Sequence, residues 1–307
     1  MREGTARGRS WLRMLRPLLG QARRTPRCPL KPRLEGQLAV VTGATSGIGV
    51  EIARGLARRG AELVLTCRDP AKGARVRDGI RAESGALVSL APLELSDLAS
   101  VDGALDAIAT AADGRHVDVL VENAGIWPQR YEITRQGHEI AFGVNVLAHF
   151  ALRRGLQQRG LLAGGRVVVV TGDIYVLASD CTPDFRWQGR RGGMQAYCRS
   201  KLGNLWIATE LTRRFPELAV YSVHPGVVAS QIGGSMGPFV DRLRTRLMLS
   251  PELGAQMPLV CATQEGLERG GYYHNTAGRL HFSQRDPAQS PAAAAELWTT
   301  CEALTSA

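Results

Sequence analysis

The sequence predicts an α/β protein in which one parallel sheet is covered by helices on both faces. Short apolar runs, such as residues 38–41 and 166–171, alternate along the chain with longer amphipathic stretches. A glycine-rich turn at residues 42–49 joins the first apolar run to the first amphipathic stretch. Strands that alternate with helices of this length form parallel sheets with two covered faces. The 307 residues are enough for one domain with a sizeable core, and no internal repeat is visible.

The expected elements follow that alternation from residue 35 onward. Buried strands are expected at residues 38–41, 62–66, 87–93, 117–122, 166–171 and 219–224. Helices are expected at residues 49–60, 71–84, 97–112, 137–158 and 195–215. The first helix shows the pattern, because its apolar residues fall on one face: Val50, Ile52, Ala53, Leu56 and Ala57.

Basic residues are concentrated at the N-terminus. Residues 1–33 contain ten Lys or Arg residues and one acidic residue, so they carry +9 of the net charge of +10. Residues 34–307 are almost neutral, which argues against a basic groove for nucleic acid. We interpret residues 1–34 as an extension of a domain at residues 35–307. Three prolines follow most of its charge, so we expect deletion of residues 1–33 to leave folding and ligand binding unchanged.

Three interpretations of the extension stay open. A block of like charges is typical of disorder. Trp11 and the leucines that follow it, set among arginines, could instead form a helix on an anionic membrane surface. The composition also fits an organelle-targeting segment. No apolar run reaches the 18 residues of a spanning helix, and six irregularly spaced cysteines indicate reduced thiols rather than disulfides or a metal site. A cytoplasmic or peripherally membrane-associated protein is expected.

The most specific chemical signal is Tyr197 followed by Lys201 in the stretch 195–215. Residues four apart on a helix lie on the same face. A cation beside a phenol favours the phenolate and lowers its pKa. The pair therefore predicts a tyrosine that donates and accepts a proton during catalysis.

The glycine turn predicts a dinucleotide site. Gly43 allows a tight turn, Gly47 lets the backbone approach a pyrophosphate, and Gly49 permits close packing of the helix on the strand. This context specifies the fold class more closely, as a single Rossmann-type doubly wound sheet. The second strand ends in Thr66, Cys67 and Arg68 instead of a carboxylate. Since an arginine can pair with a 2′-phosphate, we expect NADP(H) rather than NAD(H).

Taken together, these residues resemble the classical short-chain dehydrogenase/reductase family from about residue 36 to about residue 303. The run Glu122–Gly125 is similar to the family's Asn-Asn-Ala-Gly motif, and Asn145 matches its helix asparagine, which holds a proton-relay water. The resemblance implies that Lys201 also binds the cofactor ribose and that Val228 contacts the nicotinamide amide. Together with Tyr197 and Lys201, the implied cofactor-binding residues are Gly43, Thr45, Ser46, Gly47, Ile48, Gly49, Arg68, Glu94, Leu95, Asn123, Ala124, Gly125, Pro225, Gly226, Val228 and Ser230.

A finer resemblance is to retinol-dehydrogenase-like members and to the WW-domain-containing oxidoreductase. It rests on the motifs around Cys67, Ser96, Tyr197 and His224. This branch implies a small hydrophobic alcohol or carbonyl as substrate, and the family's tyrosine-bearing helix often joins a homodimer. An apolar stripe in residues 231–249 also suggests a hydrophobic substrate.

One residue departs from the family pattern. We align the serine that binds the substrate oxygen with Asp173, 24 residues before Tyr197. A carboxylate near Tyr197 would oppose a tyrosinate, so carbonyl reduction would be favoured and would speed up as the pH falls from about 8 to about 6. The expected catalytic residues are thus Tyr197, Lys201, Asn145 and Asp173. The alternative is a catalytically impaired NADP(H)-binding sensor or partner-binding module.

Overall fold

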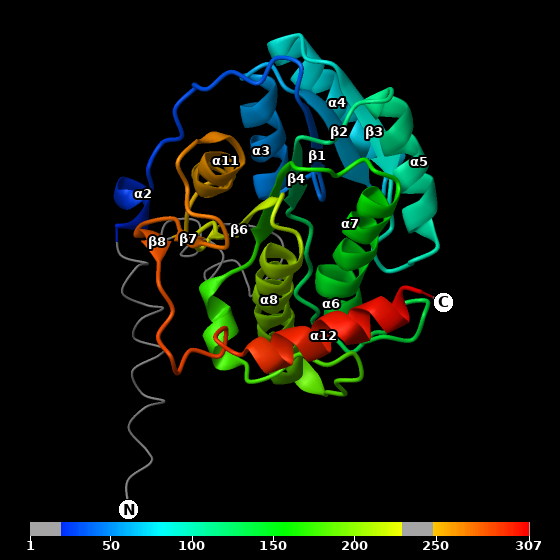
Figure 1. The fold of residues 1–307 in the computed structure, drawn as a ribbon, viewed down its shortest axis with the longest axis vertical. Helices are drawn as coiled ribbons and strands as arrows, with labels where there is room; N and C mark the ends of the chain where they lie inside the picture. Colours follow the sequence, from blue (N-terminus) through cyan, green and yellow to red (C-terminus); the bar gives the residue numbers. More distant parts are fainter. Residues whose placement is uncertain (1–19, 229–247, 307) are drawn as a thin grey trace, which may run out of the picture.

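The computed structural model describes residues 20–228 and 248–306 of the chain. Eight strands form one sheet in the order β3-β2-β1-β4-β5-β6-β7-β8 (Figure 1). Their bounds are β1 Leu38–Val41, β2 Glu62–Cys67, β3 Val88–Pro92, β4 Val119–Glu122, β5 Arg166–Val170, β6 Ala219–His224, β7 Tyr272–His274 and β8 Gly278–Leu280. All neighbours pair in parallel except β7 and β8. The predicted doubly wound sheet is confirmed.

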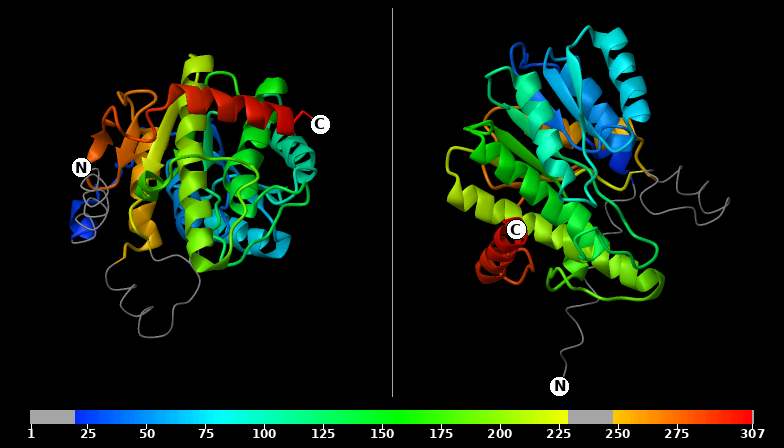
Figure 2. Two further views of the ribbon diagram at one scale, coloured as in Figure 1. Left: turned by 90° about the horizontal axis from the view of Figure 1, so that it is seen from below. Right: turned by 90° about the vertical axis from the view of Figure 1, so that its right-hand side faces the viewer.

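Helices cover both faces of the sheet (Figures 1 and 2). One hydrophobic cluster joins the sheet to α5 (Ser100–Ala112), α7 (Ala148–Gln158), α8 (Gly189–Arg214) and α12 (Pro291–Leu304). A second cluster joins it to α3 (Gly47–Ala57), α4 (Pro70–Ser84) and α11 (Gln256–Thr263). The strands read as continuous apolar runs because both of their faces are buried.

Differences from the expected elements lie near the N-terminus, at helix ends, after β5 and in the last quarter of the chain. The expected helix 137–158 is three consecutive segments: α6 (Ile140–Phe142), the π-helix η2 (Gly143–Leu147) and α7. The helix that carries Tyr197 begins six residues earlier than expected. Six observed elements were not predicted from the sequence: β7, β8, α12, α11, α10 (Pro251–Gly254) and a 3₁₀ helix, η3, at Asp173–Leu177. None of the described helices is both long and apolar enough to span a bilayer.

The boundary expected at residue 34 is wrong for the described part of the extension. Residues 20–34 lie against the domain, and the short helix α2 (Gln21–Arg24) is beside β8 in Figure 1. The amide of Gln21 pairs with both backbone groups of Val227, at 3.1 and 3.2 Å. The carbonyls of Cys28 and Pro29 accept hydrogen bonds from Arg59, whose side chain is buried. The prolines therefore do not separate this segment from the core.

Deletion of residues 1–33 is accordingly expected to destabilise the protein, in contrast to the expectation from sequence. A sharper test is Gln21→Ala, with the exposed Arg23→Ala as the matched control. Loss of the Gln21 amide leaves the Val227 N–H without a partner among the described residues, which costs about 1–3 kcal/mol for a buried group, whereas the Val227 carbonyl keeps its hydrogen bond from the Leu249 N–H. Urea unfolding should show a lower free energy of unfolding for Gln21→Ala alone. Equal stability of the two variants would contradict the contact.

Candidate active site

Tyr197 and Lys201 lie one turn apart on α8, beside the carboxyl end of β5. Lys201 is buried, and its Nζ donates a 3.0 Å hydrogen bond to the carbonyl oxygen of Val170. The same Nζ is 5.5 Å from the centre of the Tyr197 ring. Thr171 tightens this junction, because its hydroxyl donates to the Lys201 carbonyl at 2.8 Å. The predicted shared face of the two side chains is thus present.

The net shift of the Tyr197 pKa is upward, opposite to the direction that its pairing with Lys201 predicted. Burial, followed by the neighbouring Cys198, raises the pKa of Tyr197 above its usual value. Burial also lowers the pKa of Lys201 to about 8. Both shifts have one cause, because a low-dielectric surrounding disfavours the charged form of either group. Tyr197 is therefore a protonated phenol at neutral pH.

Trp127 is a site residue that the sequence analysis did not identify. Its ring stacks on that of Tyr197 with centroids 5.2 Å apart and planes inclined by 2°. Trp127 comes two residues after the Asn-Ala-Gly run. This position next to the motif is the feature of the sequence that could have identified it as a site residue. Trp127 and Tyr197, the proposed proton donor, together form a partly exposed aromatic wall.

Asn145 lies in the π-helix η2, a rare geometry that is frequent at functional sites. Its amide exchanges two hydrogen bonds with the backbone of Ile126, at 2.8 and 2.9 Å, and donates to the Ser200 hydroxyl on α8. Asn145 thereby ties the loop after β4 to the helix that carries Tyr197. Its expected role with a relay water stays a prediction.

The turn between β1 and α3 has the shape that a dinucleotide needs. Gly43 has φ +64°, and a Cβ there would lie 2.8 Å from the Ala124 backbone. A Cβ on Gly49 would collide with the carbonyl of Gly43, whereas Gly47 faces open space at φ +56°. Ser46, the N-cap of α3, makes no side-chain capping bond with the first backbone N–H groups of the helix. Thr45 belongs to the same turn, and Ile48 lies in the first turn of α3. These features fit a bound pyrophosphate.

The run Asn123–Gly125 supports this turn from β4. The Thr42 hydroxyl accepts hydrogen bonds from the backbone N–H groups of Asn123 and Ala124, and the Asn123 amide donates to the Thr42 carbonyl. His149 also contacts the Thr42 hydroxyl, at 2.9 Å. Burial lowers the pKa of His149 to about 3, so this imidazole is neutral and serves packing and hydrogen bonding.

Arg68 follows β2 at the same edge of the sheet, and its side chain is 79% exposed. Its Nε lies 3.6 Å from the carboxylate of Glu94, which in turn accepts hydrogen bonds from Ser96. Leu95 beside it packs against the core. The guanidinium is therefore largely free to meet an anionic ligand.

The loop after β6 contains the other expected cofactor residues. Gly226 has φ +91°, and a Cβ there would collide with Asn275 and Leu249. Val228 pairs with Leu249 in a β-bridge. Ser230 and most of the apolar stretch 231–249 lie outside the described residues.

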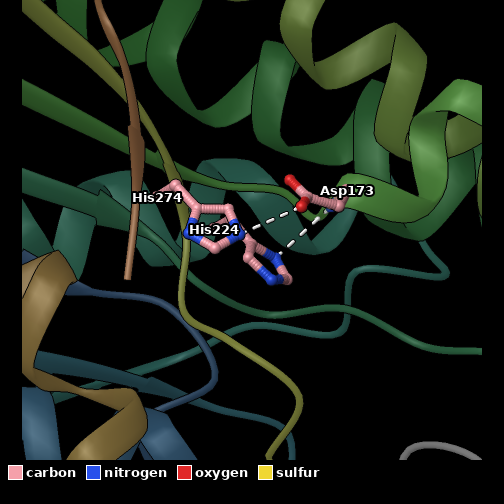
Figure 3. Close-up of side chains that lie close together, drawn as sticks. All are labelled: Asp173, His224 and His274. Atoms are coloured by element: carbon pink, nitrogen blue, oxygen red, sulfur yellow. Dashed lines mark hydrogen bonds and ion pairs between the residues drawn. The ribbon is translucent and has the colours of Figure 1, made fainter. Parts of the chain in front are cut away.

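Asp173 does not lie where the sequence analysis expected its carboxylate to act. One carboxylate oxygen accepts a hydrogen bond from the hydroxyl of Tyr272, and the other is 3.1 Å from Nε2 of His274 (Figure 3). Burial alone would raise the pKa of Asp173. The His224 and His274 imidazoles and the hydrogen bonds from His274 and Tyr272 outweigh burial and hold this pKa well below its usual range.

Two expectations for Asp173 are therefore wrong. Burial and Cys198, not Asp173, raise the pKa of Tyr197. An acid whose pKa is lowered does not titrate between pH 8 and 6, so Asp173 cannot produce the rate increase expected over that range. The Asp173 carboxylate contacts β7, which the sequence analysis did not foresee.

The comparisons with known proteins agree with this geometry. Residues 37–239 match the family model described as short chain dehydrogenase. Retinol dehydrogenase 12 of Mus musculus is 36% identical over 285 residues, covering 90% of this chain and 89% of the relative. Dehydrogenase/reductase SDR family member 13 of Bos taurus is 36% identical over 300 residues, covering 92% and 76%.

Solved structures show the same fold. An uncharacterised protein from Mycobacterium paratuberculosis superposes with a TM-score of 0.70 at 30% identity, covering 90% of this chain and 95% of that one. A short chain dehydrogenase from Burkholderia cenocepacia in complex with NADP gives a TM-score of 0.64 at 26% identity, covering 80% and 99%. The chain belongs to the short-chain dehydrogenase/reductase family, in its retinol-dehydrogenase-like branch, and is an oxidoreductase that uses a nicotinamide cofactor.

Proposed function

We propose that the protein is an NADP(H)-dependent oxidoreductase that interconverts a hydrophobic carbonyl compound and its alcohol, with reduction favoured. The observation that carries the proposal is the placement of Tyr197 and Lys201 at the end of β5, beside the β1–α3 nucleotide turn. When bound, the nicotinamide ring supplies the hydride. Tyr197 then donates its phenolic proton to the developing alkoxide, and the buried Lys201 ammonium stabilises the tyrosinate left behind.

The preference for reduction follows from burial of Tyr197 rather than from Asp173. A tyrosine whose pKa is raised holds its proton, which suits a donor and handicaps a base. The alternative of an impaired nucleotide-binding module rested on Asp173. Its carboxylate pairs with Tyr272 and His274 and so does not take over the hydrogen bond of the missing serine, and turnover distinguishes the two functions.

The hydrophobic character of the substrate is supported by the aromatic wall of Trp127 and Tyr197. Relatives named retinol dehydrogenase suggest a long apolar alcohol or its aldehyde. The test is turnover of retinaldehyde and other hydrophobic aldehydes and ketones with NADPH, and of the matching alcohols with NADP⁺. Tight NADPH binding with no turnover across this panel would instead indicate a nucleotide-binding module.

Preference for NADP(H) is expected to depend on Arg68. Its exposed guanidinium at the end of β2 can form a charge-assisted pair with a 2′-phosphate. NADPH should bind more tightly than NADH by about 1.5–3 kcal/mol, and Arg68→Ala should remove most of that difference. Arg159→Ala, beside Asp106 near the start of β5, is the matched control and should keep it. Equal affinities of the unmodified protein for both cofactors would refute this role.

A further inference from the structure

Asp173, His224 and His274 form a cluster at the carboxyl ends of three neighbouring strands (Figure 3). Asp173 follows β5, and the two histidines end β6 and β7. One potential ligand atom from each residue lies within 4.8 Å of the others, so the composition suggests a metal centre. The hydrogen bonds around the two imidazoles indicate a different use.

The protonation of His274 is set by Thr276. The backbone N–H of Thr276 donates to Nδ1 of His274 at 3.1 Å, so Nδ1 is an acceptor. A neutral imidazole has one N–H, which must then be on Nε2. This Nε2–H points at the Asp173 carboxylate, 3.1 Å away. A metal ion there would require Nε2 to be unprotonated, in conflict with the Thr276 contact.

The protonation of His224 is set in the same way by Asp173. The backbone N–H of Asp173 donates to Nδ1 of His224 at 3.3 Å. Burial lowers the pKa of His224 to about 4, so the ring is neutral and its single N–H is on Nε2. Among the residues that the structure describes, Nε2 of His224 has no hydrogen-bond partner. It is also not one of the side-chain atoms that are both unpaired and completely buried. It is therefore a donor without an acceptor among the described residues.

The His224 ring lies on the face of the sheet that carries Tyr197. In β6, Val220 packs in the cluster with α8, whereas Tyr221 and Val223 pack in the opposite cluster. Side chains alternate along a strand, so His224 shares the face of Val220 and α8. A Cβ on Gly172 would be 3.6 Å from Nδ1 of His224, so the imidazole borders the space that a side chain at position 172 would enter.

We propose that His224, through its Nε2–H, donates a hydrogen bond to the oxygen of the bound carbonyl or alcohol. The inference rests on the proposed function. Tyr197 supplies one hydrogen-bond donor to that oxygen, and His224 supplies a second. This second donor would do the work of the family's serine hydroxyl, because Gly172 has no side chain and the carboxylate of Asp173 is turned toward β7. Asp173 is then a positioning residue, because its N–H fixes the tautomer of His224 and its carboxylate anchors His274.

The test compares two substitutions of His224 that differ in side-chain length. In His224→Asn the side-chain oxygen can still accept from the Asp173 N–H, but no donor reaches the position of Nε2. In His224→Gln the amide nitrogen extends to about that position. We expect His224→Asn to lower kcat for carbonyl reduction by about 10²–10³-fold, as for loss of one donor to a reacting oxygen. We expect His224→Gln to recover part of it, with NADPH affinity and Tm close to those of the unmodified protein.

The matched control is His116→Asn, at an exposed histidine that contacts Gly160, and it should leave kcat unchanged. Turnover by the unmodified protein together with normal kcat in His224→Asn would overturn the inference and leave the proposed function standing. Absence of turnover in the unmodified protein would overturn both. Nitrogen-15 NMR of the labelled protein should show the Nε2–H tautomer at His224 and His274. Stoichiometric zinc in the purified protein, lost in His224→Asn, would also overturn the inference.

Discussion

Tyr197→Phe is expected to lower the rate of carbonyl reduction by about 10²–10⁴-fold, the usual contribution of a positioned acid–base group. The substitution removes only the hydroxyl, and the Phe ring can keep the stacking on Trp127. Lys201 keeps its contact with the Val170 carbonyl, so the end of β5 should be unchanged. The loss should therefore fall on kcat, with NADPH affinity nearly intact.

Steady-state kinetics and a fluorescence titration with NADPH separate these effects. Tyr221→Phe is a suitable control, because Tyr221 is a core tyrosine on the opposite face of the sheet. Lys201→Ala should impair both turnover and cofactor binding, since the lysine would serve both. A near-normal kcat in Tyr197→Phe would remove the proposed proton donor.

The fold and much of the candidate site were predictable because they depend on local patterns. The β1–α3 turn requires glycine at Gly43 and Gly49, where any side chain would meet the backbone, so the sequence records the geometry directly. The spacing of Tyr197 and Lys201 specifies a common helix face without any knowledge of the sheet. The resemblance to the family, rather than local geometry, placed Asn145 and the run Asn123–Gly125 near them.

The rest was not predictable because it depends on contacts between distant segments. The direction of the Asp173 carboxylate is decided by Tyr272 and His274, about 100 residues away, on a strand too short to be seen in the sequence. The extent of the extension was misjudged because nothing local shows that the Gln21 amide matches the backbone of Val227. The pKa of Tyr197 depends on burial, which the spacing to Lys201 does not report.

Arg153→Met is expected to lower the free energy of unfolding by about 3–5 kcal/mol at neutral pH, the usual cost of leaving one partner of a buried ion pair alone. Arg153 and Glu122 are 1% and 5% exposed, and their side chains are 2.5 Å apart. Burial already raises the pKa of Glu122, and Arg153 is the main influence that opposes this rise. The pair stands where the family motif begins with an asparagine, directly before Asn123.

The sign of the pH dependence distinguishes a charge effect from a packing effect. Folding raises the pKa of a carboxyl when the buried site accepts the neutral form better than the charged form. The free-energy cost of burying the charge is therefore absent below the pKa that this carboxyl has in the unfolded chain. The cost grows as the pH rises toward the raised pKa of the folded state. Removal of Arg153 raises that pKa further. The deficit of Arg153→Met, measured by urea unfolding, should therefore be smaller at pH 5 than at pH 8.

The double variant Glu122→Gln/Arg153→Met removes both charges and supplies the control. It should recover most of the lost stability and show little change in its deficit between the two pH values, because no unpaired carboxylate remains buried. A deficit in Arg153→Met that is equal at both pH values and persists in the double variant would assign the loss to the packing of Arg153 on Phe150 instead. Retention of NADPH binding by the double variant would show that the pair supports the sheet rather than the cofactor site, because Asn123 would still hold the β1–α3 turn.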